Sequence, residues 1–272
     1  MKELPMTIKK RLDLYLVQSE LCSRRKADEL IRAGAITINH FPITDPTYNV
    51  KSKDTVRYNK QIVLPKFIAE YTYILLHKPT GYVTSASDDK NRATIFDLIK
   101  KDHKDNHRLF CVGRLDINTT GILLITNDGE LTHKLAHPSF EVEKVYQVLL
   151  DRALTPEDQK TILSGVHLYD GPIKADKLEI GHDPISVRIT IHSGRNRIIR
   201  RIFGALGYTL TKLERIGFAG LSTRGLALSE WRYLRRTEVL ALKKQLLKAN
   251  FVKAAKKIAP KQPSNKKPAK TT

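Results

Sequence analysis

The sequence predicts an α+β fold: a small N-terminal module followed by a larger domain with a central mixed, largely antiparallel sheet flanked by helices. Two observations favour this class. Apolar strands occur in pairs with helices between them, without the regular strand–helix alternation of a parallel α/β sheet. The chain also has neither a GxGxxG nor a GxxxxGK loop, so dinucleotide or nucleoside-triphosphate binding is unsupported. With 272 residues, 41% of them apolar, the chain can bury a substantial core.

The N-terminal module is expected to span residues 7–60. An apolar stripe in residues 8–16 predicts a first helix. Ser23 is a suitable N-cap for a second helix in SRRKADELIRAG, and Gly34 can end it. Two strands follow, AITINH and TVRY, and the segment QIVLPKFIAE (61–70) is expected to be a linker.

Residues 71–242 are expected to form the larger domain. Thr94 with Asp97 is typical of a capping box, and Thr155 followed by Pro156 marks the start of a further helix. RNRIIRRIFGALG is typical of a basic amphipathic helix. The strands are expected in five apolar segments: YTYILLH, FCVGR, GILLIT, EKVYQVLL and SVRITIHS.

Positive charge is the strongest compositional signal. The chain has 48 basic and 28 acidic side chains, so its formal net charge is +20. Half of that excess lies in residues 243–272, which hold lysines and no acidic residue. This tail is expected to begin helically, in EVLALKKQLL, and then to be largely disordered. This composition indicates a polyanionic partner, either nucleic acid or an anionic membrane surface. The tail is expected to serve as a solubilising segment that binds any polyanion, more than as a specific contact.

Several classes of protein are disfavoured. The N-terminus lacks the apolar region of a secretory signal, and no apolar run is long enough to span a bilayer. Cys22 and Cys111 are isolated, which fits neither a disulfide framework nor a CxxC metal site, and we expect a cytoplasmic protein. His133 and His137 share a helix face but have no third ligand nearby, so no metal is expected.

Candidate chemistry centres on Asp116, in the polar segment between two apolar strands. An aspartate in a loop is most often a turn or capping residue. Arg114 would share its face if the strand continued, and Arg195, Arg197, Arg200 and Arg201 surround the start of a later helix. A carboxylate beside arginines stays ionised at neutral pH, which suits a nucleophile and not a general acid. A structural ion pair would look the same, so the residues alone leave both interpretations open.

A second basic group lies at the start of the helix in the N-terminal module. Arg24, Arg25 and Lys26 occupy its first turn, where positive charge opposes the helix dipole. Phosphate binding would explain them, and a merely solvated basic turn is the alternative. The module resembles the RNA-binding domain named after ribosomal protein S-four, over RLDLYLVQSELCSRRKADELIRAGAITIN and KDTVRYN. The family's usual glycine after Asn39 is His40 here.

The larger domain resembles the ribosomal-RNA pseudouridine synthases that carry this RNA-binding domain at their N-terminus. The motifs that match, in order, are KPTGYVTSASD, CVGRLDINTTGILLITNDGELTHKLAHP, EVEKVYQVLL, SGRNRIIRRIFGALGYTLTKLERIGF and LALSEWRYL. The resemblance implies a central mixed sheet crossed by an active-site cleft. It also implies a partner, ribosomal RNA or a pre-ribosomal particle.

The resemblance also implies roles for individual residues. Asp116 corresponds to the essential aspartate, acting as nucleophile, and Tyr146 to the tyrosine that stacks on the target uracil. In a strand, Tyr146 could equally be an ordinary core aromatic. Arg200 corresponds to the arginine that pairs with the aspartate, and the register between Arg197 and Arg200 stays open. Ile199 corresponds to the neighbouring apolar residue.

Further positions extend this implied site. Arg114 matches a position that contacts the phosphate backbone, and Arg195 and Arg197 are expected to hold RNA with it. Ile198 stands where family members usually have Gln or Glu.

Isomerisation of uridine needs no oxidant, donor or water, so no cofactor is expected. Whether Asp116 attacks the sugar, adds to the base or removes a sugar proton stays open. Flipping the target base out of its stack costs a few kcal/mol, least in loops and bulges. The expected enzyme is a monomer that modifies one or a few uridines of ribosomal RNA. GRNR and the lysine tail favour a large-subunit enzyme over a small-subunit one. One alternative is a non-catalytic RNA-binding or ribosome-assembly factor on the same scaffold. The other is a membrane-surface protein that binds through the polybasic tail, which lacks an apolar amphipathic partner face and a lipidation motif.

Overall fold

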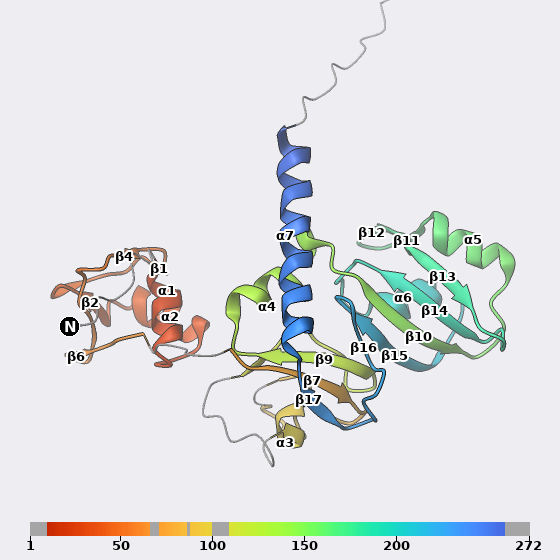
Figure 1. The fold of residues 1–272 in the computed structure, drawn as a ribbon, viewed down its shortest axis with the longest axis horizontal. Coiled ribbons are helices and arrows are strands. Elements are labelled where there is room, and N and C mark those ends of the chain that lie inside the picture. Colours follow the sequence, from red (N-terminus) through yellow and green to blue (C-terminus); the bar gives the residue numbers. More distant parts are fainter. Residues whose placement is uncertain (1–9, 66–70, 86–87, 100–108, 259–272) are drawn as a thin grey trace, which may run out of the picture. The chain divides into compact units, whose positions relative to one another are not determined.

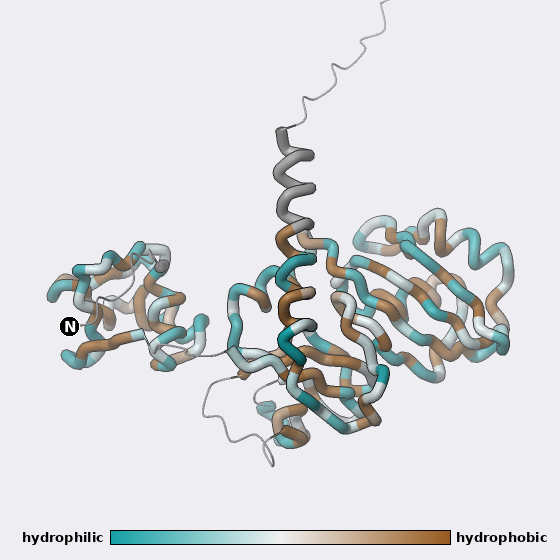
Figure 2. The backbone as a smooth tube through the Cα atoms, viewed as in Figure 1, coloured by the Kyte–Doolittle hydropathy of each residue, from teal (hydrophilic) through white to brown (hydrophobic). Residues whose placement is uncertain are grey.

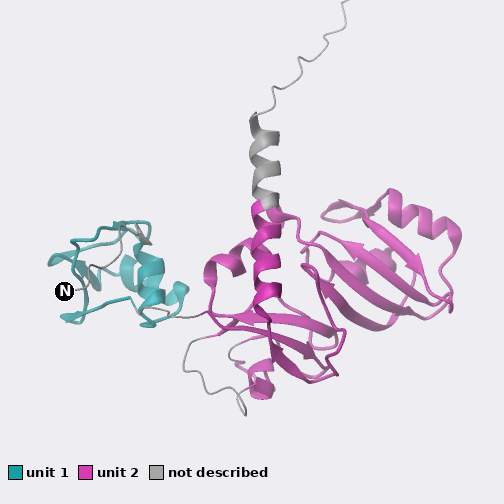
Figure 3. Ribbon diagram, in the orientation of Figure 1, with its two compact units in different colours: residues 1–70 teal, residues 71–272 magenta. Residues whose placement is uncertain are grey.

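The structure is a computed structural model and describes residues 10–65, 71–85, 88–99 and 109–258, with side chains along the last helix described as far as Leu247. The chain divides into two compact units, residues 1–70 and residues 71–272 (Figure 3). Each unit combines helices with sheets that are mainly antiparallel (Figure 1). The α+β prediction is therefore confirmed. No helix among these residues is long and apolar enough to cross a bilayer.

The first unit packs two helices against a small sheet. Helices α1 (Leu12–Gln18) and α2 (Arg24–Arg32) cover a four-stranded sheet in the order β3-β2-β5-β6. Its strands are β2 (Ile36–Ile38), β3 (Phe41–Pro42), β5 (Val56–Tyr58) and β6 (Gln61–Ile62). A second, two-stranded sheet pairs β1 (Lys10–Arg11) with β4 (Asn49–Val50). As predicted, Ser23 caps α2 by accepting a hydrogen bond from the Lys26 amide.

Two details of this unit differ from the sequence-based expectations. Strand β6 lies inside the expected linker 61–70, because Gln61 and Ile62 pair with β5 and Val63 is buried in the core. Residues 66–70 of that linker, and residues 7–9 of the expected module, lie outside the described part of the chain. The turn at Asn39 and His40 forms without a glycine. Both residues take positive φ, and the Asn39 side chain bonds Asp54 and the Thr55 amide, which holds the turn.

The second unit is built on one central sheet (Figure 1). Its main strand order is β13-β14-β10-β15-β9-β7-β17, with β8 and β16 added beside β9 and β15. All pairs are antiparallel except β9 with β15, which run parallel. The strands are β7 (Tyr73–Lys78), β8 (Phe110–Cys111), β9 (Thr120–Thr126), β10 (Lys144–Leu150), β13 (Lys177–Ile180), β14 (Ser186–Ile191), β15 (Leu210–Phe218), β16 (Leu221–Ser222) and β17 (Trp231–Tyr233).

Helices cover the two halves of this sheet separately. Apolar side chains of β7 and β9 pack on one face against α4 (Gly129–Ala136) and α7 (Arg236–Ile258), and on the other against α3 (Ile95–Ile99). Figure 2 shows the hydrophobic run along these two strands. Strands β10, β13 and β14 instead share a core with α5 (Pro156–Ser164) and α6 (Ile198–Ala205). The short elements are η1 (Pro138–Phe140) and the hairpin of β11 (Val166–Leu168) and β12 (Gly171–Ile173).

The expected tail boundary at residue 242 falls inside α7 and is too early. Leu242 and Leu246 are both buried, so the apolar stripe of the helix continues past that point. Lys243 also lies 3.9 Å from the carboxylate of Asp128, the N-cap of α4, and over the ring of Tyr73. Residues 243–258 therefore belong to a helix anchored on the second unit. Residues 259–272 of the expected tail lie outside the described part of the chain.

Candidate active site

The loop that carries Asp116 connects β8 to β9. Exposure alternates along it, because Arg114 and Asp116 are exposed while Leu115 between them is buried. The strand ends at Cys111, so the continuation on which the expected shared face depended is absent, but Arg114 and Asp116 both line the same cavity. The Thr84 hydroxyl accepts a hydrogen bond from the Leu115 amide and donates one to the Leu115 carbonyl. The Gly81 amide donates to the Ile117 carbonyl, so the segment after β7 holds this loop at two points.

A buried lysine holds the same loop from below. Lys78, at the end of β7, is fully buried, and its ammonium donates to carbonyl oxygens of the loop and of Pro79. The loop acceptors are Asp116 at 3.1 Å, Ile117 at 3.4 Å and Thr119 at 3.0 Å. Desolvation lowers the pKa of Lys78 to about 8, against the attraction of the Asp116 carboxylate. The lysine ammonium carries three N–H donors on one nitrogen, so a single side chain can hold several carbonyls of the loop at once.

Asp116 opens onto a cavity of about 160 Å³. Tyr146 and Arg215 line it from two adjacent strands of the sheet, and Arg197 lines it from the start of α6. The cavity also brings together Arg114, Arg195 and Ile199, so six of the residues singled out from the sequence meet at one place. The remaining lining residues are Gly113, Leu115, Thr119, Leu135, Ala136, Lys144, Ser193, Gly194, Ile198, Leu213 and Phe218.

The arginine nearest Asp116 is Arg197. Its Nε lies 3.8 Å from Asp116 Oδ2, and both side chains are largely exposed. The expectation that Arg200 pairs with Asp116 is not met: the Arg200 guanidinium lies 3.5 Å from the Asn118 carbonyl oxygen. The reason is local backbone geometry. Arg197 takes the left-handed conformation, with φ of 47°, so α6 begins only at Ile198 and Arg200 projects from its first turn.

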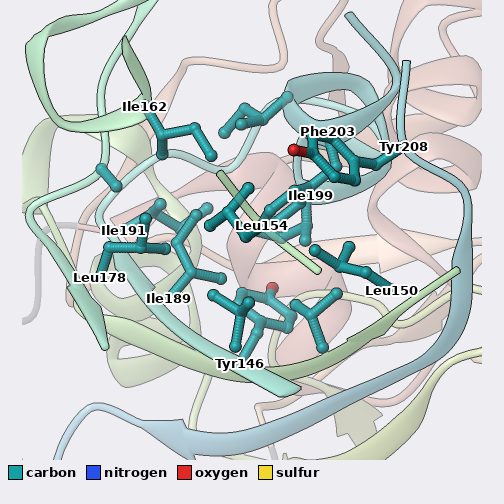
Figure 4. Close-up of a cluster of buried hydrophobic side chains, with 14 of the residues drawn as sticks. Tyr146, Leu150, Leu154, Ile162, Leu178, Ile189, Ile191, Ile199, Phe203 and Tyr208 are labelled. Carbon is teal, nitrogen blue, oxygen red and sulfur yellow. The ribbon is translucent and has the colours of Figure 1, made fainter. Parts of the chain in front are cut away.

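Tyr146 lies in the middle of β10, directly across the strand pair from Arg215. It is 9% exposed and belongs to the core that α6 covers, and Figure 4 shows it in the same cluster as Ile199 and Phe203 of that helix. Its hydroxyl faces the Arg215 guanidinium. Burial lowers the pKa of Arg215, and the nearby Tyr146 hydroxyl opposes that effect. Tyr146 is therefore a core aromatic that also borders the cavity, so both sequence interpretations describe its position.

Arg215 was not singled out in the sequence. Its guanidinium is buried and donates twice to the Ile122 carbonyl, at 3.0 and 2.8 Å, and lies over the Phe218 ring. The approach of β15 to β9 depends on Gly121, whose φ is +121°. A Cβ at that position would lie 2.3 Å from the Arg215 carbonyl oxygen, a contact that only glycine avoids. Gly121 thus sets the distance between the Asp116 loop and Arg215.

Lys144 is the third cation missed in the sequence. It precedes Tyr146 by two residues on β10, lines the cavity and donates to the Val142 carbonyl at 2.8 Å. Burial lowers its pKa to about 8, and nearby Arg215 acts in the same direction. The two-residue spacing from Tyr146 is the signal that would have indicated it. The Thr119 hydroxyl, also in the cavity wall, is one of two buried side-chain polar atoms in the described residues that lack a partner.

The other expected site residues have different surroundings. Ile198, at the position where a polar residue was expected, is 4% exposed and packs in the core. Arg24, Arg25 and Lys26 belong to the first unit, and each has an acidic partner there. Arg24 binds the buried Asp13 at 3.0 Å, whereas Lys26 and Arg25 approach Glu29. Among the described residues, no cluster of three or more His, Cys, Asp or Glu side chains could hold a metal ion.

Comparison with known proteins identifies both units. Residues 72–205 match the family model for RNA pseudouridylate synthases, and residues 10–56 match the S4 domain. The chain is 36% identical to ribosomal large subunit pseudouridine synthase B of Bacillus subtilis, over 86% of this chain and 95% of that protein. It is 34% identical to the dual-specificity RNA pseudouridine synthase RluF of Escherichia coli, over 95% of this chain and 87% of that protein. Among solved structures, a pseudouridylate synthase superposes with a TM-score of 0.61 at 29% identity, over 85% of this chain and 99% of that one.

Proposed function

The chain belongs to the RNA pseudouridylate synthase family, and we propose that it isomerises a specific uridine of large-subunit ribosomal RNA to pseudouridine. The observation that carries this proposal is the cavity in which the Asp116 carboxylate meets Tyr146 and Arg215. The similarity to a large-subunit enzyme over 95% of its length supports the substrate class. The S4 domain in the first unit supports an RNA substrate.

The reaction leaves the composition of the nucleotide unchanged. The bond between uracil N1 and ribose C1′ breaks, the base turns, and C5 bonds to C1′ while C5 loses a proton and N1 gains one. We assign Asp116 as the nucleophile, because its carboxylate opens onto the cavity and its backbone is held by Lys78. A fixed backbone keeps the reactive group within the narrow range of positions that attack requires.

Tyr146 and the cations supply the rest of the proposed chemistry. The tyrosine ring borders the cavity beside buried core side chains, where it can stack on a uracil that has left its helix. While the base is detached from the sugar it carries negative charge, and the nearby Arg215 and Lys144 cations stabilise that charge in a poorly solvated site. Among the described residues, Asp116 is the one carboxylate that lines the cavity, whereas a glycosidase uses a pair of carboxylates.

RNA binding is assigned to cations that reach the surface, most of them exposed and Arg195 half-buried. Arg114, Arg195 and Arg197 lie at the cavity and are placed to contact phosphates around the target nucleotide. In the first unit, Arg25 projects into solvent with 94% of its side chain exposed. We assign Arg25 and Lys26 to RNA binding as well. Arg24 is assigned to RNA binding too, and its guanidinium also forms an ion pair with the buried Asp13.

We further propose that the protein acts in the cytoplasm as a monomer. A non-catalytic RNA-binding factor on the same scaffold would not need to keep Asp116, Tyr146 and the cations around one cavity.

The test is transfer of the modification to unmodified RNA. Ribosomal RNA from a strain lacking the gene is incubated with wild-type protein or with Asp116→Asn, and pseudouridines are mapped by carbodiimide treatment and primer extension. Wild-type protein is expected to create a new stop, and Asp116→Asn none, with RNA affinity retained. Asp183→Asn, in an exposed turn, is the matched control and is expected to be fully active.

Each result has a separate meaning. Wild-type protein that creates no stop would refute the enzyme proposal and favour the non-catalytic factor. An Asp116→Asn variant as active as wild type would refute the nucleophile assignment alone.

A further inference from the structure

The tip of the β11–β12 hairpin carries an exposed tyrosine without a packing role. Tyr169 is 89% exposed, the highest value among the large apolar and aromatic side chains that are exposed in the described part of the chain. Its strands form a separate two-stranded sheet that contacts α6. Burying a tyrosine ring normally stabilises a fold, but this ring contributes almost no burial. Its position therefore needs an explanation other than core packing.

One face of this ring is covered by a fixed cation. The Arg201 guanidinium lies 4.2 Å from the centre of the Tyr169 ring. Arg201 is itself mostly buried, and its two terminal nitrogens both bind the Asp170 carboxylate, one of them at 3.0 Å. A bidentate pair fixes the plane of a guanidinium more firmly than a single bond does. The ring is thus held on one side while its other face is open to solvent.

The same hairpin is tied to the wall of the candidate active site. Arg195 lines the cavity, donates to the Gly171 carbonyl at 3.0 Å and lies 3.5 Å from the Asp170 carboxylate. Asp170 is the residue that follows Tyr169, so one arginine connects the cavity with the hairpin tip. Two arginines thus approach Asp170 beside the ring, Arg201 over the ring itself and Arg195 from the cavity wall, so the one carboxylate is outnumbered by cations.

A rigid aromatic face next to arginines matches an unpaired nucleotide. Proteins that bind single-stranded RNA stack bases on aromatic rings, and the surrounding cations bind the phosphates. The ring here is already held by Arg201, so little side-chain freedom is lost when a base stacks on it. We propose that the open face of Tyr169 is a stacking platform for one unpaired base of the substrate RNA, flanking the target uridine. This inference rests on the proposed function and adds a recognition element outside the catalytic cavity.

The experiment pairs a change in the protein with a change in the RNA. The substrate is an RNA fragment containing the uridine that wild-type protein modifies, made also as a series with one abasic nucleotide at each flanking position. Tyr169→Ala is expected to raise KM by about 5- to 100-fold, with kcat unchanged at saturating RNA. Tyr169→Phe and Tyr169→Trp keep a ring and are expected to stay within about twofold of wild type. Tyr169→Leu, which keeps apolar cover without a ring face, is expected to behave like Tyr169→Ala.

The abasic series identifies the partner of the ring. At one flanking position, loss of the base is expected to raise the KM of wild-type protein by the same factor as Tyr169→Ala. The Ala variant is expected to be insensitive to that loss, because the stacking contact is already gone. Tyr233→Ala, another exposed tyrosine, on strand β17 at the far edge of the central sheet, is the control and is expected to match wild type.

The two proposals fail in different ways. Active wild-type protein with a normal KM for Tyr169→Ala would overturn the platform and leave the proposed function intact. A KM increase that is independent of every abasic position, or that Tyr169→Phe shares, would show a structural role for the tyrosine and also overturn the platform. Wild-type protein that makes no pseudouridine would refute the proposed function and the platform with it.

Discussion

Two groups of cations surround the candidate active site, and they differ in what they bind. Lys78, Lys144 and Arg215 form the floor group: Lys144 and Arg215 line the cavity, and Lys78 lies beneath the Asp116 loop. All three are largely or fully buried and donate to backbone carbonyl oxygens. Arg114, Arg195 and Arg197 form the rim group, of which Arg114 and Arg197 are exposed and Arg195 is half-buried. Arg195 and Arg197 approach carboxylates at 3.5 and 3.8 Å, and Arg195 also donates to the Gly171 carbonyl. A buried cation held by the chain's own carbonyls has a permanent structural partner. An exposed cation with a distant carboxylate can exchange that partner for a phosphate at little loss, because such surface pairs contribute little stability.

Because the two groups differ in burial and in their partners, positive charge alone does not show which arginine or lysine binds RNA. A floor cation is expected to affect folding and the rate of the chemical step. A rim cation is expected to affect RNA affinity and its dependence on salt. Lys78→Met and Arg114→Gln test this division, and Arg25→Ala applies the same comparison to an exposed cation of the first unit. Their expected effects decrease in that order.

Lys78→Met removes the donor that holds the Asp116 loop. Several buried carbonyls lose their partner, at about 1–3 kcal/mol each, so we expect the free energy of unfolding to fall by about 3 kcal/mol or more. Misplacement of Asp116 is expected to lower kcat about 100-fold. Chemical denaturation and single-turnover kinetics measure the two effects. The control is Lys212→Met on β15, whose side chain is 63% exposed, and it is expected to stay within about 0.5 kcal/mol of wild type.

The pH dependence of stability gives an independent check on Lys78. Its pKa is about 8 in the folded chain and ordinarily 10.5, so between these values the unfolded chain binds a proton that the folded chain has released. Rising pH in this window therefore stabilises wild type relative to Lys78→Met, and the difference between their melting temperatures is expected to widen. A difference that is constant from pH 7 to about 10.5 would contradict a buried ammonium.

Arg114→Gln removes a rim cation that forms no ion pair among the described residues. We expect RNA affinity to fall about tenfold for every RNA sequence tested, because phosphate contacts carry no sequence information. The slope of log affinity against log salt is expected to decrease by about 0.7 to 0.9, the value for one phosphate contact. Filter binding at several salt concentrations measures both, and unfolding experiments are expected to show no change in stability. An unchanged slope with a lower kcat would place Arg114 with the floor group.

Arg25→Ala is expected to have the smallest effect, and its neighbour provides the comparison. Arg25 is 94% exposed, and its ion pair with Glu29 is long, at 3.7 Å. Its loss is therefore expected to change the free energy of unfolding by less than about 0.5 kcal/mol and to lower RNA affinity a few-fold. Arg24→Ala leaves the buried Asp13 with one arginine fewer and is expected to destabilise the first unit more. Thermal melting compares the two variants. An equal loss of stability in both would show that Arg25 also supports the fold.

Sequence alone located the Asp116 loop, Tyr146 and the first-turn caps, because each depends on a short segment with a fixed pattern. Ser23 and Thr155 cap their helices as predicted, since capping involves residues within one turn. Lys78, Lys144 and Arg215 were missed because their partners are backbone carbonyls, most of them distant in the sequence, and carbonyls carry no sequence signal. An arginine within the apolar alternation of β15 was the available clue, since charged side chains rarely face a core.

Other differences arose from backbone geometry and from packing between elements. The left-handed conformation of Arg197 moves the start of α6, and no side chain in SGRNR requires it. The end of the second unit was placed too early because the lysines of α7 resemble a solvated tail. The burial of Leu246 and the contact of Lys243 with Asp128 depend on α4, more than a hundred residues earlier in the chain.

The one parallel junction in the central sheet has a consequence for how the molecule folds. Strands β9 and β15 meet over only two residue pairs, and their bridging contact between Ile122 and Arg215 spans 93 residues of sequence. Contacts that close such long loops form late, because their entropic cost must be met before they contribute stability. The core of β10, β13 and β14 depends on pairings of shorter range, whereas β17 and α7 join β7 from still farther along the sequence. We therefore expect the cavity, which needs the junction of β9 with β15, to be completed late in folding, after the core of β10, β13 and β14 has formed.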